Sequence, residues 1–307
     1  MGGVERGRGP ADQDGGVPEA AAGEADRRAR ARATGGVPAV DVDGGGGFAT
    51  PYDRYVRPDV LHGLQQPVTD VPEERAFLVA SQIMELYFGL LRHEWELAQR
   101  HLRADEVWDA VAVLRRSVRE FEGLVAAWST VDWLEPAAFN RFRDALGVAS
   151  GFQSWGYRRL EILLGSRQRS LVDMYRGNPA VHESLLRASA APSLYDDAIA
   201  VLARAGVAVP AAVLDRDPGE EHRPHPAVEA AWVEVLGRAP GDPLLELAGV
   251  LTDLSAAFGE WRFRHLTAVR RSMGAKAGTG GSSGVAWLER SLARAVFPEL
   301  WSARTAV

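Results

Sequence analysis

The sequence contains no cysteine among its 307 residues. This absence excludes disulfide bonds, cysteine-ligated zinc, cysteine-held iron–sulfur clusters and thiolate ligands for iron. No apolar run approaches the roughly 18 residues that a membrane-spanning helix needs. The N-terminus also lacks the apolar core of a signal peptide, so we expect a soluble, cytoplasmic protein.

Positive charge is in short supply, since 35 Lys and Arg stand against 41 Asp and Glu and give a formal net charge of -6. A chain with this balance offers no general footprint for nucleic acid or for an anionic membrane surface. Hydrophobic residues nevertheless make up 46% of the sequence, which is ample for a sizeable core. We therefore expect a globular protein without nucleic-acid or membrane partners.

Large apolar side chains are nearly absent from the first 47 residues, which consist mostly of Gly, Ala, Arg and acidic residues. Such a segment cannot bury enough surface to offset the entropy cost of ordering. The composition changes at Phe48, where amphipathic patterning begins. We predict a disordered extension over residues 1–47 and a single folded domain over residues 48–307.

Apolar residues recur at steps of three and four through most of the remaining chain, which predicts helices. The long predicted helices cover residues 72–102, 104–129 and 244–273, with shorter ones over 136–146 and around 157–164. Prolines and a Pro-Gly turn divide residues 165–238 into shorter helices without evident chemistry. His222 and His225 lie there beside prolines, and we expect a solvated turn rather than a metal site.

His265 lies on the apolar stripe of the predicted helix over residues 244–273, so its side chain should point inward. One interpretation is a core histidine whose ring nitrogens bond neighbouring groups. The alternative is an axial ligand to haem iron, because imidazole is a common ligand to such iron and a rigid helix fixes its angle. The helix pattern alone does not separate the two interpretations.

Two loops rich in small residues form a second candidate feature. Residues 278–284 are Gly-Thr-Gly-Gly-Ser-Ser-Gly, and residues 147–154 follow closely after Arg143. The first loop lacks the Gly-Lys-Ser/Thr ending and the preceding strand of a phosphate-binding loop. It is either a flexible linker or a ligand-binding loop in which the Thr279 hydroxyl bonds a polar group. Arg143 is likewise either a surface residue or a clamp for a carboxylate.

Two polar side chains interrupt the inward face of the first long predicted helix. Ser81 and Glu85 share this face with Phe77, Met84 and Phe88. A serine in such a position usually bonds the carbonyl one turn back. A buried glutamate needs a partner, such as an arginine or a group of backbone amides.

Six separate motifs follow one another along the chain. They are Tyr52-Asp53-Arg54-Tyr55, Phe77 through Glu85-Leu86, Phe142-Arg143-Asp144 with Leu146-Gly147, Ser150-Gly151-Phe152-Gln153-Ser154 with Tyr157-Arg158, Trp261-Arg262-Phe263-Arg264-His265, and Gly278-Thr279-Gly280-Gly281-Ser282-Ser283-Gly284. In this order they resemble the tryptophan 2,3-dioxygenase family, from about residue 48 to the C-terminus. No single motif carries the resemblance, whereas the six together do.

The resemblance implies an all-α helical bundle that binds b-type haem and assembles as a homotetramer, a dimer of dimers. It implies that His265 is the proximal iron ligand, that Arg143 pairs with the substrate carboxylate and that Thr279 meets its ammonium group. The other implied contacts are Phe77 and Phe142 as walls for the indole, Ser150 as a polar contact on the haem side, and Tyr52, Tyr55 and Val56 as a segment from a neighbouring subunit.

Two positions depart from the family. Ser81 stands where the family has a distal histidine beside the indole nitrogen, and Phe139 stands where it has a tyrosine. Serine is shorter than imidazole and takes no proton near neutral pH, so any bond that it makes to the indole N–H or to oxygen is weaker or passes through water. The related indoleamine dioxygenases also have serine on the distal side, so ring cleavage can proceed without the histidine.

The resemblance thus implies a haem-dependent oxygenase that uses O2 on the indole of L-tryptophan or a substituted tryptophan such as β-methyltryptophan. Arg143 and Thr279 would fix the amino-acid end while oxygen adds at indole C2 and C3. Insertion of both oxygen atoms gives N-formylkynurenine. Insertion of one oxygen atom gives a 2-oxindole and requires an external reductant. This reaction is typical of a secondary-metabolism branch of the superfamily, which Ser81 modestly favours. Both outcomes stay open, beside a haem-binding sensor and a helical scaffold without cofactor.

Overall fold

The computed structural model describes residues 29, 32 and 50–307, so the predicted extension over residues 1–47 lies almost wholly outside it. The described residues belong to two compact units that divide between Leu64 and Gln65. In the first unit they include two short helices, α2 (Pro51–Val56) and α3 (Pro58–Gly63). The predicted domain boundary at residues 47/48 falls outside the described residues and stays a prediction.

The second unit is built from helices, and the residues that the structure describes contain no β-strand. The α-helices are α4 (Pro72–Arg103), α5 (Val107–Ala126), α6 (Pro136–Arg143), α7 (Trp155–Leu163), α8 (Arg169–Asp173), α9 (Pro179–Ser189), α10 (Leu194–Arg204), α11 (Ala211–Leu214), α12 (Pro226–Leu236), α13 (Pro243–Met273), α14 (Val285–Leu292) and α15 (Pro298–Ser302). Short 3-10 turns add η1 (Ala127–Thr130), η2 (Asp144–Leu146), η3 (Gly151–Gln153) and η4 (Ala303–Thr305). The all-α prediction is confirmed.

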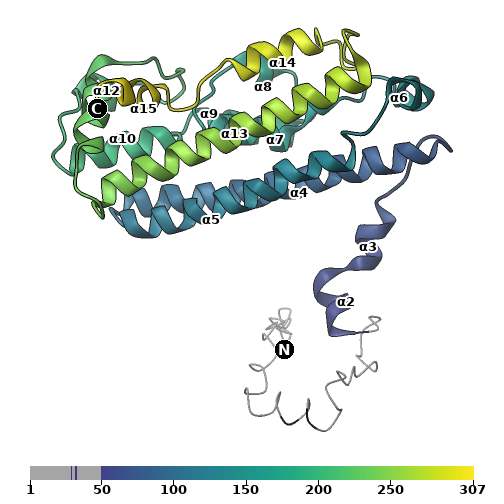
Figure 1. Ribbon diagram of the computed structural model, residues 1–307, viewed down its shortest axis with the longest axis horizontal. Coiled ribbons are helices and arrows are strands. Elements are labelled where there is room, and N and C mark those ends of the chain that lie inside the picture. The colour runs from purple at the N-terminus through teal and green to yellow at the C-terminus, as the bar shows by residue number, and fades with distance from the viewer. Residues whose placement is uncertain (1–28, 30–31, 33–49) are drawn as a thin grey trace, which may run out of the picture. The chain divides into compact units, whose positions relative to one another are not determined.

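The three longest helices, α4, α5 and α13, pack side by side along the second unit, with α5 against both others (Figure 1). Their facing stripes form the main core, in which Trp95, Phe121 and Phe258 are almost fully buried. Ring pairs bridge the helices: Trp95 stacks on Phe121 with centroids 6.2 Å apart, and Phe121 meets Phe258 edge-on at 6.0 Å. The buried stripes read from the sequence therefore do meet in one core.

Local signals explain where α13 begins and ends. The Asp242 carboxylate accepts hydrogen bonds from the amides of Leu244 and Leu245, and Pro243 occupies the first turn, where its missing N–H costs nothing. At the other end Gly274 takes φ of 59°, a left-handed value that favours glycine. The predicted range 244–273 is thus reproduced to within one residue.

The two ends of the second unit contain different helices. Figure 1 shows α6 beside the C-terminal end of α13, whereas α10, α12 and α15 gather at the opposite end. At that opposite end the Glu299 carboxylate accepts from Tyr195 Oη at 3.0 Å and lies 2.6 Å from His222 Nε2, and Trp232 Nε1 donates to Tyr195 Oη at 2.9 Å. We call Glu299, Tyr195, His222 and Trp232 the Glu299 network.

The Glu299 network corrects the prediction for His222. Its side chain is only 8% exposed and Glu299 only 1%, so the expected solvated turn is wrong at this position. A buried carboxylate is stable there because Tyr195, His222 and the backbone amide of His225 all reach it. These contacts hold the Glu299 pKa below its usual value although burial opposes the shift.

No helix in the described part of the chain combines the length and the apolar character needed to cross a membrane.

Candidate functional site

His265 lies near the C-terminal end of α13, partly buried among aromatic rings. Its imidazole stacks on Trp128 with ring centroids 4.8 Å apart and planes 18° from parallel, and lies 5.5 Å from Trp261. Burial lowers the His265 pKa from 6.5 to about 4, so the ring is neutral near pH 7 and keeps a free lone pair. Among the described residues no hydrogen-bond donor or acceptor meets either ring nitrogen.

Other polar atoms near His265 also lack partners. Within the described residues, the indole nitrogens of Trp128 and Trp261 are buried without a hydrogen bond, as are Nε and Nη2 of Arg158. Tyr157 links these positions, because its ring lies 4.9 Å from that of Trp261. Buried polar atoms are usually hydrogen-bonded in folded proteins, so these atoms are available to a polar group of a ligand.

The charges behind this region are unbalanced. Glu161 bonds Arg262 through Oε1 at 3.0 Å and pairs with Arg158 through Oε2. All three side chains are at most about a tenth exposed, so two buried cations share one buried anion. An uncompensated buried cation is costly, and an anionic group beside Arg158 would relieve that cost.

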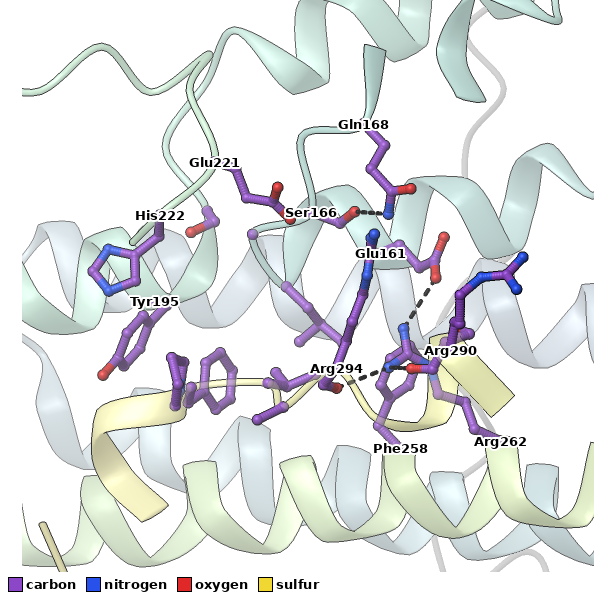
Figure 2. Close-up of a pocket in the computed structure, with 18 of the residues that line it drawn as sticks. Glu161, Ser166, Gln168, Tyr195, Glu221, His222, Phe258, Arg262, Arg290 and Arg294 are labelled. Atoms are coloured by element: carbon purple, nitrogen blue, oxygen red, sulfur yellow. Dashed lines mark hydrogen bonds and ion pairs between the residues drawn. The ribbon is translucent and has the colours of Figure 1, made fainter. Parts of the chain in front are cut away.

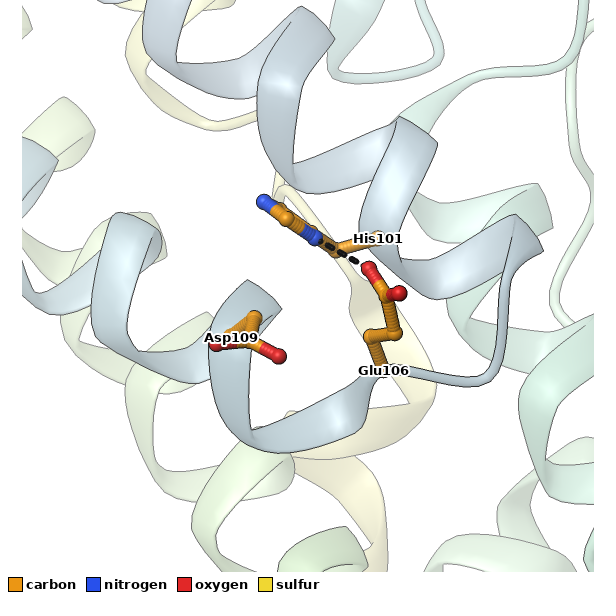
Figure 3. A group of neighbouring side chains, drawn as sticks. All are labelled: His101, Glu106 and Asp109. Carbon is orange, nitrogen blue, oxygen red and sulfur yellow. Dashed lines mark hydrogen bonds and ion pairs between the residues drawn. The ribbon is translucent and has the colours of Figure 1, made fainter.

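A lone histidine suits haem better than a metal held by protein side chains alone. A porphyrin supplies four nitrogens to its iron, so the protein needs to add only an axial ligand. Among the residues that the structure describes, one group of three metal-type side chains occurs, His101, Glu106 and Asp109 (Figure 3). It surrounds the turn between α4 and α5, at the far end of α4 from Ser81, and it does not include His265.

Aromatic contacts set α4 and α13 antiparallel around this region. Phe88 on α4 meets Trp261 on α13 edge-on at 5.6 Å. Toward the start of α4 and the end of α13, Phe77 and Met273 join a second cluster. Ser81 lies between Phe77 and Phe88 on α4, and His265 lies between Trp261 and Met273 on α13. Ser81 and His265 therefore both lie between the Phe88–Trp261 contact and the cluster that contains Phe77 and Met273.

Ser81 differs from its prediction. The residue is exposed rather than inward, because α4 carries its buried stripe on Ala80 and Met84. Its hydroxyl donates to the carbonyl of Phe77 at 3.0 Å, as expected of a serine in mid-helix. Glu85, one turn later, is likewise exposed as a residue, and the hydroxyl of Ser154, rather than an arginine, bonds its carboxyl. Burial of that carboxyl raises its pKa.

The predicted indole walls form one aromatic cluster. Phe77, Phe139 and Phe142 lie with ring centroids 5.2 to 5.7 Å apart, and Leu134 completes the buried set. Phe142 is fully buried and Phe139 nearly so, whereas Phe77 keeps part of its surface open. Phe77 is therefore the ring of this cluster with surface available to a ligand.

The two small-residue loops, far apart in sequence, lie against each other. Thr279 Oγ1 donates to the carbonyl of Ala149 at 2.5 Å. A Cβ on Gly280 would lie 2.8 Å from the Cβ of Ser150, so only glycine allows this approach. Ser150 itself begins η3, where its hydroxyl accepts from the amide of Phe152. The linker interpretation of residues 278–284 is therefore wrong.

Arg143 ends α6 and reaches the same loop. Its Nη2 donates to the carbonyl of Ala277 at 2.5 Å, while its Nε is buried and has no partner in the part of the chain that the structure describes. The structure thus brings Arg143, Ser150 and Thr279 together through loop contacts. The guanidinium retains one unsatisfied donor, as a carboxylate-binding arginine requires before its ligand arrives.

The remaining predicted contacts lie elsewhere. Tyr52, Tyr55 and Val56 belong to α2 in the first unit, and the two tyrosines are 64% and 90% exposed. Sequence reasoning missed Trp128, the ring stacked on His265, and gave Arg158 no role. Nothing in the local sequence of Trp128 sets it apart from a core tryptophan.

Comparisons with known proteins identify the family of the chain. The profile of the family described as tryptophan 2,3-dioxygenase matches residues 37–205 and 237–307. The tryptophan 2,3-dioxygenase of Bradyrhizobium diazoefficiens is 40% identical over 256 residues, which cover 83% of this chain and 91% of that protein. Those of a Polaromonas species and of Caulobacter vibrioides are 39% and 40% identical over 83% of this chain, covering 87% and 97% of their own lengths. The chain therefore belongs to the tryptophan 2,3-dioxygenase family, a family of haem-dependent oxidoreductases.

Proposed function

We propose that the protein cleaves the indole ring of L-tryptophan with both atoms of O2, giving N-formylkynurenine. The observation that carries this proposal is His265, a neutral imidazole without a hydrogen-bond partner among the described residues, at a position that the family profile covers. Three relatives at about 40% identity bear the dioxygenase name, which favours ring cleavage over the one-oxygen alternative.

A b-type haem would be held by His265 and by the polar atoms that lack partners. His265, through Nε2 or Nδ1, would supply a protein ligand to the haem iron, and the Arg158 guanidinium would offer donors to a haem carboxylate. When bound, the haem supplies the activation of O2. The residues of the chain then have to position the substrate.

Arg143 and Thr279 would hold the amino-acid end of the substrate. The free Nε of Arg143, with Nη2 released from Ala277, can bond a carboxylate through two donors. The Thr279 hydroxyl, released from the Ala149 carbonyl, can accept from the ammonium group. Phe77 would then contact the indole, with Phe139 and Phe142 supporting it from behind. Ser150 would contribute its hydroxyl on the haem side.

Ser81 would stand nearest to the indole nitrogen, where its hydroxyl can bond the N–H directly or through water. A serine cannot serve as a base near neutral pH, so no residue at this position removes the indole proton. Ring cleavage needs no such step in the overall balance, because two oxygen atoms add and the C2–C3 bond breaks. Formation of a 2-oxindole would instead need two electrons and two protons from an external reductant, with the second oxygen leaving as water.

The proposed assembly is a homotetramer arranged as a dimer of dimers, in which Tyr52, Tyr55 and Val56 complete the substrate site of a neighbouring copy. The exposure of both tyrosines on α2 supports a partner surface there. Light scattering of the purified protein tests the assembly, and a monomer that turns over tryptophan would contradict it.

Mass spectrometry of the product tests the reaction. Haem-loaded protein is given tryptophan, or β-methyltryptophan, under ¹⁸O-labelled O2 without added reductant. We expect N-formylkynurenine with two labelled oxygens, and more rapid turnover of tryptophan than of its methylated form. A product with one labelled oxygen that forms only with a reductant would replace this proposal by the 2-oxindole alternative.

A Ser81→His variant makes this experiment sharper. A histidine returns a stronger hydrogen-bond partner for the indole, so kcat/KM for tryptophan should rise by about three- to tenfold, the equivalent of one hydrogen bond. The product should stay the same. A change of product in the variant would show that residue 81 decides how many oxygens are inserted.

A further inference from the structure

A cavity of about 170 Å³ lies apart from His265 and its loops. It opens between the turn that follows α7, the segment before α12, and the stretch of chain between α14 and α15 (Figure 2). Its volume exceeds the roughly 30 Å³ that one water occupies in the liquid, so it can hold a small organic molecule. Nothing in the proposed reaction uses this cavity.

An exposed arginine, Arg294, lines the cavity. Figure 2 shows the side chain of Arg294 extending toward Ser166 and Gln168. Within the part of the chain that the structure describes, its guanidinium makes no hydrogen bond or ion pair. Ser166 Oγ accepts from Gln168 Nε2 at 3.3 Å, and its own hydroxyl proton remains free to donate. Several donors therefore converge at one side of the cavity.

The chain around Arg294 is held in place by a buried cation. Arg262 Nη1 donates to the carbonyls of Ser291 and Arg294 at 3.0 and 3.3 Å, and its guanidinium lies 4.2 Å from the ring centroid of Phe258. With Arg262, Arg290 and Arg294 the cavity wall carries three arginines against two glutamates, Glu161 and Glu221. The buried Arg158 behind Glu161 adds further positive charge.

The lining also includes apolar side chains, beside polar ones such as Ser193, Tyr195 and Ser291. Trp287 and Val296, both partly exposed, line the cavity, and the backbone at Phe297 is fixed by the Glu299 network two residues later. Small-molecule sites commonly combine such apolar walls with a few converging polar groups. A planar guanidinium beside an apolar wall matches a carboxylate attached to an aromatic or aliphatic group.

The cavity is lined by residues inside and outside the stretches that the family profile matches. Glu221 and His222 come from residues 206–236, which the family profile leaves unmatched, whereas Arg294 and Phe297 come from matched residues. This location separates the cavity from the substrate site around Arg143, which lies wholly in matched residues.

We propose that this cavity binds a small apolar monocarboxylate. The carboxylate pairs with the guanidinium of Arg294 and accepts from Ser166, and the apolar part lies against Trp287 and Val296. Glu221 at the rim disfavours ligands with a second negative charge. The residues that hold the carboxylate, Arg294 and Ser166, are not among those proposed to hold the haem or the tryptophan.

The test uses phenylacetate as probe and phenylacetamide, its neutral counterpart, as control. Binding to the full-length purified protein is measured by isothermal titration calorimetry without oxygen and with saturating tryptophan, so that Arg143 is occupied and no turnover occurs. We expect saturable binding of one phenylacetate per chain, and binding of phenylacetamide at least about tenfold weaker, because a charge-assisted bond is lost. Absence of saturable binding, or equal affinity for the two probes, would overturn the proposal.

Variants localise the binding. Arg294→Gln should weaken phenylacetate binding by at least about tenfold, the loss of one charge-assisted bond. Arg119→Gln, which removes an exposed arginine paired with Glu122 away from the cavity, should leave it unchanged. Arg294→Gln should keep its haem content and its turnover of tryptophan, so failure of this proposal is distinguishable from failure of the oxygenase assignment. Unchanged binding in Arg294→Gln would place the carboxylate elsewhere and refute the site.

Discussion

Two histidines in the second unit, His265 and His222, have opposite surroundings. His265 lies among the rings of Trp128 and Trp261 without a hydrogen bond in the described residues, and burial lowers its pKa to about 4. The His222 side chain is also largely buried, at 8% exposed, but lies 2.6 Å from the carboxylate of Glu299. The His265 ring keeps a lone pair for a ligand, whereas a nitrogen of the His222 ring is already engaged with Glu299 and so stabilises the fold. Burial alone therefore does not mark a functional histidine, and the missing partner does.

The first prediction removes each histidine in turn. His265→Ala should lose nearly all haem, because the axial ligand is absent, and should keep its helical content. His222→Asn should keep haem and lose stability instead. Haem content from the pyridine haemochrome spectrum and the Soret band checks both variants. A His265→Ala protein with normal haem content would end the comparison.

The second prediction concerns the network at the opposite end. Glu299→Ala leaves Tyr195, His222 and the amide of His225 without their acceptor and should lower the free energy of unfolding by about 3 kcal/mol or more. Urea denaturation measures it. Glu299→Gln keeps the shape and should lose less. A stable Glu299→Ala protein would show that the network is not needed for folding.

The third prediction concerns Arg143, at the His265 end. Arg143→Ala should raise the KM for tryptophan by at least about tenfold, because a carboxylate loses two donors, and should leave haem content unchanged. Arg143→Lys should recover only part of the loss, since an ammonium group is not planar. Steady-state kinetics measures both variants. An unchanged KM would refute the carboxylate contact.

The fourth and smallest prediction is the pH dependence of stability. The folded-state pKa of Glu299 is lowered from 4.5, so the stability it contributes is present above pH 4.5 and is lost as the pH falls through the folded value. The slope from this one group is at most about 1.4 kcal/mol per pH unit. In Glu299→Gln the free energy of unfolding, measured with urea, should fall less steeply below pH 4.5 than in the unmodified protein. The same pH dependence in both proteins would contradict the contacts of Glu299 with Tyr195, His222 and His225.

Helix periodicity predicted the elements well, because apolar stripes are a local property of the sequence. The range of α13 and the inward position of His265 both follow from it. It failed at Ser81, where the stripe turns toward Ala80 and Met84 and leaves the serine exposed. A step of one residue around a helix is 100°, so a small error in the stripe moves a side chain from the core to the surface.

Contacts between distant residues escaped the sequence. Thr279 bonds Ala149 across 130 residues, and His222 meets Glu299 across 77, and no local pattern encodes either pairing. The prolines around His222 are typical of exposed turns, and only the folded chain reveals its buried partner. The order of the motifs predicted the roles of Arg143 and Thr279. That two separate loops bring these residues together became visible only in the structure.

The close approach of Gly280 to Ser150 has a consequence for anyone who diversifies this protein. A side chain at residue 280 would meet a Cβ atom rather than the flexible end of a side chain, so the loops would have to separate. Saturation libraries that include residue 280 should consist almost entirely of inactive members. Residue 281, where an added Cβ has open space but φ is 80°, would tolerate little more than Asn. Libraries aimed at new substrates should therefore vary residues 77, 81 and 139 and leave Gly280 and Gly281, where the two loops meet, unchanged.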